Sequence, residues 1–374
     1  MSILDTETAV FCNDLKYKKR EFIGKGTYGI VYKVTIEKTR AFRGATTIAA
    51  KICKLSDQSA EETEQEIRAR LNKLTTLRHR NVLEYYRYEI TEANGLPALE
   101  IIMEWCSGDL GKYMTDAQQK KLNWTTVVRF GIDMAEGLGF LFDQCIIHGD
   151  LKPSNIFVKI SQWNQQHLVI GDLDDYVLMH GDTTVSQDVR NLRGTPRYMS
   201  PEIVKKFIAQ NTARPGRKSD IWSFGCIMVD LVNGRVGYKE KWLQNGNDRV
   251  RFNAALTEHQ YVRYIVNGYA PEIIDTIRAD ISACIRQCLH TDDVRRISGK
   301  ELSKQMRKLQ TWREVLGEHK VLVRNVSGVL YQRHRSRLVI LAFVIVGILW
   351  IIAFVHSCYQ NNPSKKVVWH YNIV

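Results

Sequence analysis

The stretch that decides the fold covers residues 147–158 and reads Ile147-His148-Gly149-Asp150-Leu151-Lys152-Pro153-Ser154-Asn155-Ile156-Phe157-Val158. An amphipathic pattern over 124–143 precedes it and predicts a helix. A short apolar run follows at 168–170 and predicts a strand that leads into Gly171-Asp172-Leu173-Asp174. The polar residues of both segments therefore fall in loops between regular elements, where a rigid scaffold can hold them close together.

Four of these loop residues form a set that suits phosphoryl transfer. Asp150 can orient an attacking hydroxyl and accept its proton, and Lys152 can neutralise charge on the transferred phosphoryl group. Asn155 and Asp172 offer the oxygen ligands that Mg²⁺ prefers. A single Asp and Asn at this spacing is usually only a polar turn between strands, so the interpretation needs support from elsewhere in the chain.

That support comes from a glycine-rich stretch nearer the N-terminus. Gly24, Gly26 and Gly29 lie between alternating apolar residues, a pattern that predicts a strand, a turn and a second strand. The backbone of such a turn can approach phosphates closely and donate N–H groups to them. Further along, Lys51 interrupts an apolar run, where a lysine is costly unless its ammonium meets an anion. Alone, the glycine-rich stretch could be a plain hairpin, and alone, Lys51 could extend its side chain to water. The two features together favour a site for nucleotide phosphates.

With its motifs in this order, the chain resembles a eukaryotic protein kinase over residues 17–310. The resemblance implies an α+β, bilobal fold with a β-rich N-lobe and a helical C-lobe. It implies ATP and Mg²⁺ as cofactors and a protein as substrate, and Lys152 indicates serine or threonine as the acceptor. It also pairs Arg296 with Glu202 and makes 220–225 part of the helix that anchors the catalytic loop.

The resemblance assigns a role to each residue of the expected site. Asp150 and Lys152 are catalytic, and Asn155 and Asp172 are the metal ligands. The ATP site combines the loop over the phosphates, apolar residues that enclose the adenine ring and a hinge that hydrogen-bonds it. The residues assigned to ATP are Ile23, Gly24, Gly26, Gly29, Val31, Ala49, Lys51, Met103, Glu104, Cys106 and Phe157.

Three positions depart from the family pattern. Gly149 stands where an arginine usually precedes the catalytic aspartate, so activity is expected to depend less on a phosphate in the activation segment. Asp174 replaces a glycine, and altered loop behaviour is expected because glycine accepts a positive φ more easily. On the helix that supplies the usual glutamate partner of Lys51, family spacing puts Arg70 at that position and Glu66 one turn earlier. Whether Glu66 or Arg70 faces Lys51 stays open.

A second segment, 338–355, is apolar throughout and long enough as a helix to cross a bilayer. Arginines crowd its N-terminal side, so the positive-inside bias places the kinase-like part in the cytosol. The expected organisation is a kinase domain at 17–310, a basic juxtamembrane linker at 311–337, the transmembrane helix and a short tail at 356–374. We therefore expect a tail-anchored, single-pass protein with the lipid bilayer as a partner, in a membrane that the sequence does not identify.

The composition is that of a packed protein. Hydrophobic residues make up 44% of the chain and charged residues 25%, which excludes a disordered or fibrous chain. The 8 cysteines form no zinc-type pairs and fit reduced thiols. We assign much of the net charge of +13 to the face beside the membrane, because anionic lipid attracts basic residues and no nucleic-acid recognition motif is present.

These observations predict an ATP-dependent Ser/Thr protein kinase that its C-terminal helix anchors to a membrane. The alternative is a catalytically weak pseudokinase scaffold that recruits partners to that membrane. The irregular helix around Arg70 and the replacement at Asp174 favour the alternative, whereas the complete set of Lys51, Asp150, Asn155 and Asp172 favours the enzyme.

Overall fold

The computed structural model of the chain divides into two compact units, Met1–Gln310 and Thr311–Val374. All residues that the structure describes belong to the first unit. They are 17–25, 29–37, 42–54, 64–93, 96–116, 122–160, 165–174, 176–180, 183–184, 195–210, 215–233, 241–244, 248–251, 258–271, 273 and 278–310.

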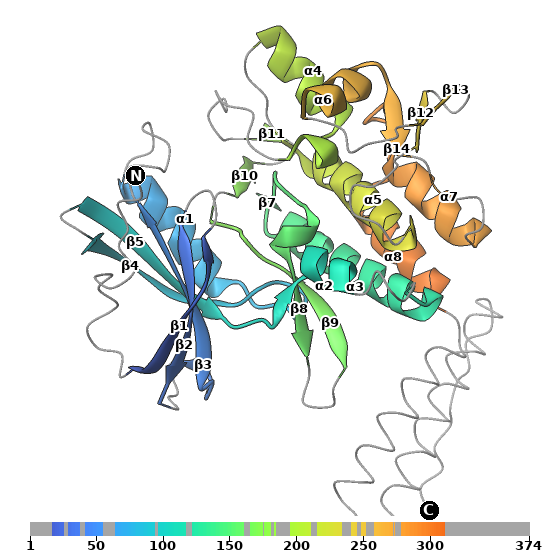
Figure 1. The fold of residues 1–374 in the computed structure, drawn as a ribbon. Helices are drawn as coiled ribbons and strands as arrows, with labels where there is room; N and C mark the ends of the chain where they lie inside the picture. Colours follow the sequence, from blue (N-terminus) through green and yellow to red (C-terminus); the bar gives the residue numbers. More distant parts are fainter. Residues whose placement is uncertain are drawn as a thin grey trace, which may run out of the picture. The chain divides into compact units, whose positions relative to one another are not determined.

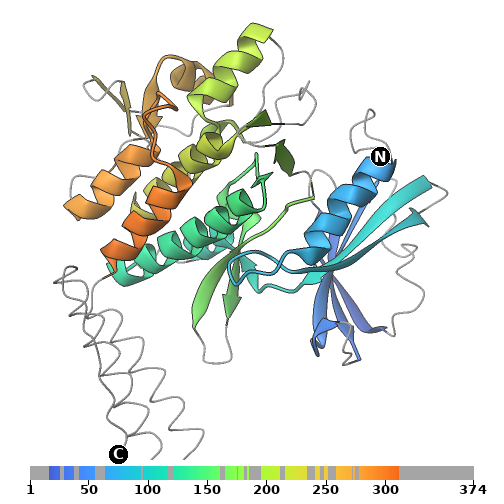
Figure 2. The same cartoon turned by 180° about the vertical axis from the view of Figure 1, so that it is seen from behind.

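Five antiparallel strands form the N-terminal lobe, in the order β1-β2-β3-β5-β4. They are β1 Tyr17–Lys25, β2 Ile30–Ile36, β3 Thr47–Lys54, β4 Tyr85–Ala93 and β5 Leu96–Glu104. Along β2 buried and half-buried residues alternate, as they must when successive side chains point to opposite faces of a sheet. The helix α1, Glu64–Thr76, lies against β4 and buries Ile67, Leu71 and Leu74 (Figures 1 and 2).

The second lobe is mostly helical. Its helices are α2 Leu110–Asp116, α3 Trp124–Asp143, α4 Pro201–Gln210, α5 Arg217–Asn233, α6 Glu258–Val266, α7 Ala279–Cys288 and α8 Gly299–Leu309. Its strands are β6 Gly108–Asp109, β7 Ile146–Ile147, β8 Ile156–Ile160, β9 Gln166–Ile170, β10 Val177–His180, β11 Thr183–Thr184, β12 Lys241–Gln244, β13 Asp248–Arg251 and β14 Tyr269–Pro271. Two short 3-10 helices, η4 Pro153–Asn155 and η5 Pro196–Tyr198, complete it.

Helix α3 confirms the helix predicted over 124–143. It begins where the side chain of Asn123 accepts a hydrogen bond from the backbone N–H of Thr126 at 2.8 Å, which satisfies one of the free donors of the first turn. Its apolar face packs against α5, α8 and β9. The helix therefore supports β9, the strand that leads into Asp172.

One hydrophobic cluster runs through both lobes. It includes Ala49 and Leu99 from the sheet, Leu74 from α1 and Leu138 and Trp222 from the large helices. A second cluster covers the other side of the sheet. Because both lobes share a core, the loops between them are held in a defined arrangement. The architecture confirms the predicted α+β, bilobal fold (Figure 1).

Within the described residues, the structure contains no helix that is both long enough and apolar enough to span a bilayer. The predicted spanning segment at 338–355 lies outside the described residues, as do the predicted linker at 311–337 and tail at 356–374.

Candidate active site

The loop that carries Asp150 runs from β7 through η4 to β8 and is fixed to α5. Asp220, buried in the first turn of α5, accepts hydrogen bonds from the backbone N–H groups of His148 at 2.8 Å and Gly149 at 3.0 Å. Both carboxylate oxygens are used, as expected for the helix that anchors this loop. Gly149 has a φ of +78°, a left-handed conformation that glycine adopts at little cost. The positive φ therefore gives a backbone reason why this position carries glycine and not the arginine usual in the family.

Three groups hold Asp150 in place. The Lys152 ammonium donates to Oδ2 at 2.6 Å, and the backbone N–H of Thr195 donates to Oδ1 at 3.2 Å. The side-chain amide of Asn155 donates to the main-chain carbonyl of Asp150 at 2.8 Å. The Asp150 side chain is still 30% exposed. Its carboxylate is thus oriented by neighbours and remains accessible to an incoming hydroxyl.

Asn155 and Asp172 lie on adjacent loops that main-chain contacts join. The N–H of Gly171 donates to the carbonyl of Asn155 at 3.0 Å. The buried ring of His148 donates from Nε2 to the carbonyl of Gly171 at 2.9 Å. Asp172 itself has a φ of +58°, which is uncommon for a residue other than glycine. Asp174, which replaces the family's glycine, is not among the described residues with a positive φ.

Lys51 reaches this loop from β3. Its Nζ lies 2.7 Å from Oδ1 of Asp172 and 2.5 Å from Oδ2 of Asp174. Burial alone lowers the pKa of Lys51, but the carboxylates of Asp174 and Asp172 raise it well above its usual value. Burial alone raises the pKa of Asp172, but the Lys51 ammonium brings it below its usual value. Lys51 and Asp172 are therefore both ionised at neutral pH.

The open question about α1 has an unexpected answer. Glu66 is exposed on α1 and Arg70 is half-buried. The carboxylates beside Lys51 come instead from Asp172 and Asp174 on the loop after β9. Sequence reasoning missed the Asp174 contact, although a signal was present, namely an additional acid two residues after Asp172 in a chain with an arginine at the usual glutamate position.

A tyrosine that sequence reasoning also missed holds this loop from the other lobe. The hydroxyl of Tyr85, at the start of β4, accepts a hydrogen bond from the N–H of Leu173 at 2.8 Å. Both Tyr85 and Leu173 are buried. The hydroxyl of Tyr176 donates to the carbonyl of Arg70 at 3.4 Å, so α1 also contacts the segment beyond the loop. A single tyrosine in a strand pattern is ordinarily read as core, which is why the sequence did not single it out.

The residues predicted to enclose adenine come together in one hydrophobic cluster. Ala49 pairs with Met103 across β3 and β5, and both belong to the cluster with Cys106. Val31 and Phe157 pack against it from either lobe. The N–H of the predicted hinge residue Glu104 donates to the carbonyl of Glu84 at 2.8 Å, and the Glu104 carboxylate forms an ion pair with Lys159. Ile23, on β1, is 44% exposed.

The two strands predicted around the glycine-rich stretch are β1 and β2, which pair antiparallel, and the predicted turn at 26–28 lies outside the described residues. A Cβ at Gly24 would meet no atom within 4 Å, so this glycine faces open space. A Cβ at Gly29 would lie 2.5 Å from the carbonyl oxygen of Ile52, so only glycine allows this close approach to β3. Gly26 lies outside the described residues.

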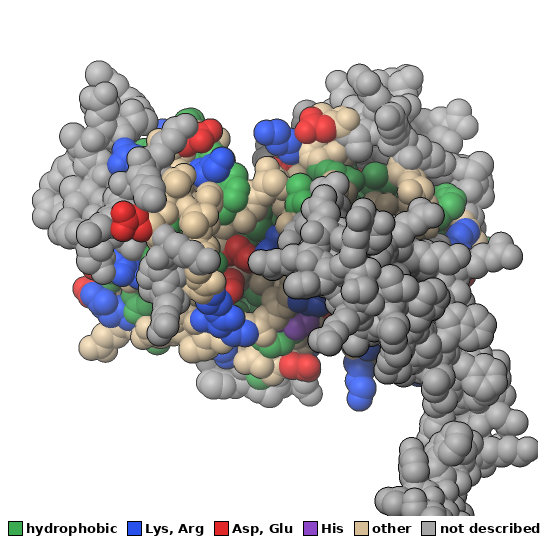
Figure 3. Space-filling model, turned by 90° about the horizontal axis from the view of Figure 1, so that it is seen from below, with side chains coloured by type: hydrophobic (Ala, Val, Ile, Leu, Met, Phe, Trp, Pro, Cys, Tyr) green, Lys and Arg blue, Asp and Glu red, His purple; other side chains and the backbone are tan. Residues whose placement is uncertain are grey.

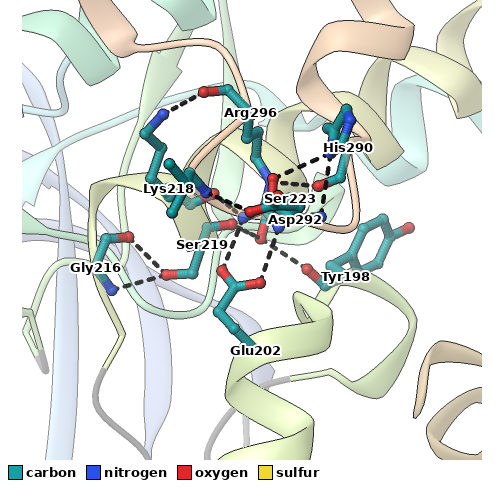
Figure 4. A network of polar contacts seen from close by, with 10 residues as sticks. Tyr198, Glu202, Gly216, Lys218, Ser219, Ser223, His290, Asp292 and Arg296 are labelled. Carbon is teal, nitrogen blue, oxygen red and sulfur yellow. Dashed lines mark hydrogen bonds and ion pairs between the residues drawn. The ribbon is translucent and has the colours of Figure 1, made fainter. Parts of the chain in front are cut away.

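The predicted pair of Arg296 and Glu202 is confirmed and is bidentate. Nη1 and Nη2 of Arg296 each donate to one carboxylate oxygen of Glu202 at 2.8 Å. The same guanidinium donates to the main-chain carbonyls of Lys218 and His290 (Figure 4). The pair therefore ties α4 to α5 and to the loop before α8. Figure 3 shows acidic side chains in the region between the two lobes.

A family model described as the protein kinase domain matches residues 17–307. The chain belongs to the protein kinase family. The match begins with β1 and ends in α8, so the kinase domain contains both lobes and every site residue described above.

The kinase is similar to several characterised proteins. It is 25% identical over 288 residues to mitogen-activated protein kinase kinase kinase 1 of Arabidopsis thaliana, covering 76% of this chain and 41% of the relative. It is 24% identical over 303 residues to serine/threonine-protein kinase SSK22 of Saccharomyces cerevisiae, with 77% and 20% covered. It is 28% identical over 312 residues to the G2-specific protein kinase nim-1 of Neurospora crassa, with 75% and 32% covered.

The kinase thus spans less than half the length of each of these relatives. Several matching proteins are named serine/threonine-protein kinases.

Proposed function

We propose that the chain transfers the γ-phosphoryl group of ATP to serine or threonine hydroxyls of a protein substrate. The observation that carries the proposal is the convergence of Lys51, Asp150, Asn155 and Asp172. They come from three segments, namely β3, the loop of Asp150 and Asn155, and the loop after β9, and these segments contact one another. In phosphoryl transfer the protein acts mainly by positioning the reactants and by stabilising charge, and less by forming covalent bonds. The ammonium of Lys51 and the carboxylates of Asp150 and Asp172 place positive and negative charges close together for this purpose.

Asp150 positions the acceptor. With its oxygens held by Lys152 and Thr195, the carboxylate can accept a hydrogen bond and then the proton from a substrate hydroxyl. The hydroxyl oxygen forms the new bond to phosphorus as the bond between phosphorus and the bridging oxygen of ADP breaks. Lys152, beside Asp150, offsets the negative charge that gathers on the transferred group.

The residues at the metal position fit Mg²⁺. Asp172 offers a charged carboxylate that is 36% exposed, and Asn155 turns its amide nitrogen toward Asp150, so that its side-chain oxygen is the atom suited to a cation. When bound, Mg²⁺ neutralises phosphate charge. Lys51 lies beside Asp172, where its ammonium can reach phosphate oxygens.

The adenine end of the site is apolar and lies between the lobes. Ala49, Met103 and Cys106 are buried, and Val31 and Phe157 are partly buried against them. Burial raises the pKa of the Cys106 thiol to about 12, so the hinge carries no thiolate at neutral pH. A flat heterocycle can stack between such side chains while the hinge backbone hydrogen-bonds its edge.

A transfer assay tests the proposed activity. Asp150→Asn keeps the size of the side chain and removes its basicity, so ³²P incorporation from γ-labelled ATP into a protein substrate should fall by about 100-fold or more. The matched control is Asp280→Asn, on the exposed side of α7, which should match the wild type. Equal incorporation by Asp150→Asn and the wild type would exclude the enzyme and favour the catalytically weak scaffold.

We also propose that residues 338–355 anchor the kinase in a membrane with its catalytic domain in the cytosol. The support is the sequence itself, an unbroken apolar run with arginines on its N-terminal side.

Imaging of a tagged protein tests the anchor. The full chain should stain a membrane, and the chain without 338–374 should become diffuse. The tag belongs at the N-terminal end, so that it does not mask the anchor. Unchanged membrane staining after truncation would count against it.

A further inference from the structure

Asp174 makes a buried ion pair that the family pattern does not require. Its carboxylate lies 2.5 Å from the Nζ of Lys51, and the two side chains are only 8% and 13% exposed. A buried charge costs free energy unless it is paired, so the Asp174 carboxylate and the Lys51 ammonium each need the other as a counter-charge. The contact joins β3 of the small lobe to the loop after β9.

Lys51 needs a partner of this kind if it is to hold a phosphate. A lysine side chain is long and flexible, and a fixed carboxylate restricts where its ammonium can lie. In protein kinases a glutamate on the helix corresponding to α1 has that task. Here Arg70 stands at that position, and the exposed Glu66 lies a turn earlier.

We propose that Asp174 is the positioning residue of Lys51, in place of a glutamate on α1, so that the phosphate-binding lysine is held by the same loop that carries Asp172. This inference rests on the proposed function and concerns how its nucleotide site is built. A helix that must move to bring a glutamate to the lysine is a means of control. In this chain the lysine is positioned without that movement.

The surroundings of Asp174 support a fixed rather than a mobile partner. Leu173, the residue before it, is fully buried, and its N–H is bound by the hydroxyl of Tyr85 at 2.8 Å. Lys51 and Asp174 are 123 residues apart in the sequence, on different lobes. The ion pair can therefore form only when both lobes are folded. The loop is therefore held from β4 through Tyr85 and from β3 through Lys51.

The charge balance also requires both acids. Asp172 is the proposed metal ligand, and a cation bound there competes with Lys51 for the same carboxylate. Asp174, which is more buried than Asp172, then remains as the counter-charge of the lysine. One carboxylate can thus serve the metal while the other serves Lys51.

Three variants of the full chain test the proposal. Asp174→Asn removes the charge at constant size, Asp174→Glu keeps the charge, and Asp174→Asn combined with Arg70→Glu supplies a carboxylate from α1. The readouts are KM for ATP and kcat in the transfer assay, equilibrium affinity for Mg²⁺-ATP, and Tm. Asp280→Asn is again the matched control.

We expect Asp174→Asn to raise KM for ATP and weaken Mg²⁺-ATP binding by about 10- to 100-fold, the usual value of a hydrogen bond to a charged group. Asp174→Glu or the added Arg70→Glu should recover part of that loss. Unchanged ATP affinity in Asp174→Asn would overturn the proposal. The proposal would also be overturned if the loss of ATP affinity in Asp174→Asn paralleled a drop in Tm and neither Asp174→Glu nor the added Arg70→Glu recovered it. That result would indicate a purely structural role.

The binding measurement separates this inference from the proposed function. If the wild type transfers no phosphate but binds Mg²⁺-ATP through Asp174, the proposed activity fails and the positioning role stands. If the wild type transfers phosphate and Asp174→Asn binds ATP normally, the activity stands and the positioning role fails.

Discussion

At the scale of single residues, two buried ion pairs of the large lobe each join separate segments. Arg296, whose side chain is fully buried, contacts both oxygens of Glu202. Asp230 on α5 is equally buried and is bound by the guanidinium of Arg197 and by the hydroxyl of Tyr198 at 2.9 Å. Removing one member leaves the other as an uncompensated charge, which costs more than the pair contributes.

Arg296→Lys should therefore destabilise the fold. A lysine keeps the charge but cannot bind Glu202 with two parallel N–H groups. We expect the free energy of unfolding to fall by about 2–4 kcal/mol, measured by urea denaturation. The neighbouring Arg295→Lys is the matched control, because that side chain is 75% exposed and should change stability by less than about 0.5 kcal/mol. Equal stability of the two variants would contradict this account.

At the scale of elements, α3 and β9 are joined by a buried acid. Asp133 on α3 is 5% exposed, and its Oδ2 accepts a hydrogen bond from the N–H of Leu168 at 2.9 Å. Burial raises the pKa of Asp133 to about 6, although the hydrogen bonds from Leu168 and Asn81 lower it. Because β9 leads into Asp172, this contact helps to position the proposed metal ligand.

Asp133 should make stability depend on pH. Below about pH 4 it is protonated in both the folded and unfolded states, and above about pH 6 the folded state must hold a buried charge. Stability due to this residue is therefore lost as pH rises from about 4 to 6, by up to about 3 kcal/mol. Asp133→Asn lacks this titration, so its free energy of unfolding relative to wild type should increase from pH 4 to pH 7. Denaturation at both pH values measures this, and a constant difference would be evidence against it.

Elements were predictable where local patterns decide them. The apolar spacing was enough to predict α3, and alternation was enough to predict β2. The long-range contacts of Lys51 were different. Its partner at Asp174 lies 123 residues away, and the family pattern has no acid there, so neither periodicity nor resemblance could indicate the pair. The pair of Arg296 and Glu202, by contrast, follows the family and was predicted correctly.

At the scale of the whole molecule, the described residues belong to one unit, and the proposed nucleotide site lies where its two lobes meet. The sheet contributes Lys51, Val31 and Ala49, and the helical lobe contributes Phe157 and the proposed catalytic and metal-binding residues Asp150, Asn155 and Asp172. Neither lobe contains a complete site. A nucleotide bound there would therefore contact both lobes and should stabilise the folded chain in proportion to its affinity.

A crystal structure of the full chain with Mg²⁺ and a non-hydrolysable ATP analogue is the most direct test of this account. We predict Mg²⁺ bound by oxygens of Asn155 and Asp172, phosphate oxygens beside the Lys51 ammonium, and the Asp150 carboxylate facing the γ-phosphate. Nucleotide density elsewhere, or a site filled by the chain's own side chains at saturating nucleotide, would contradict the proposal that these residues form one phosphoryl-transfer centre.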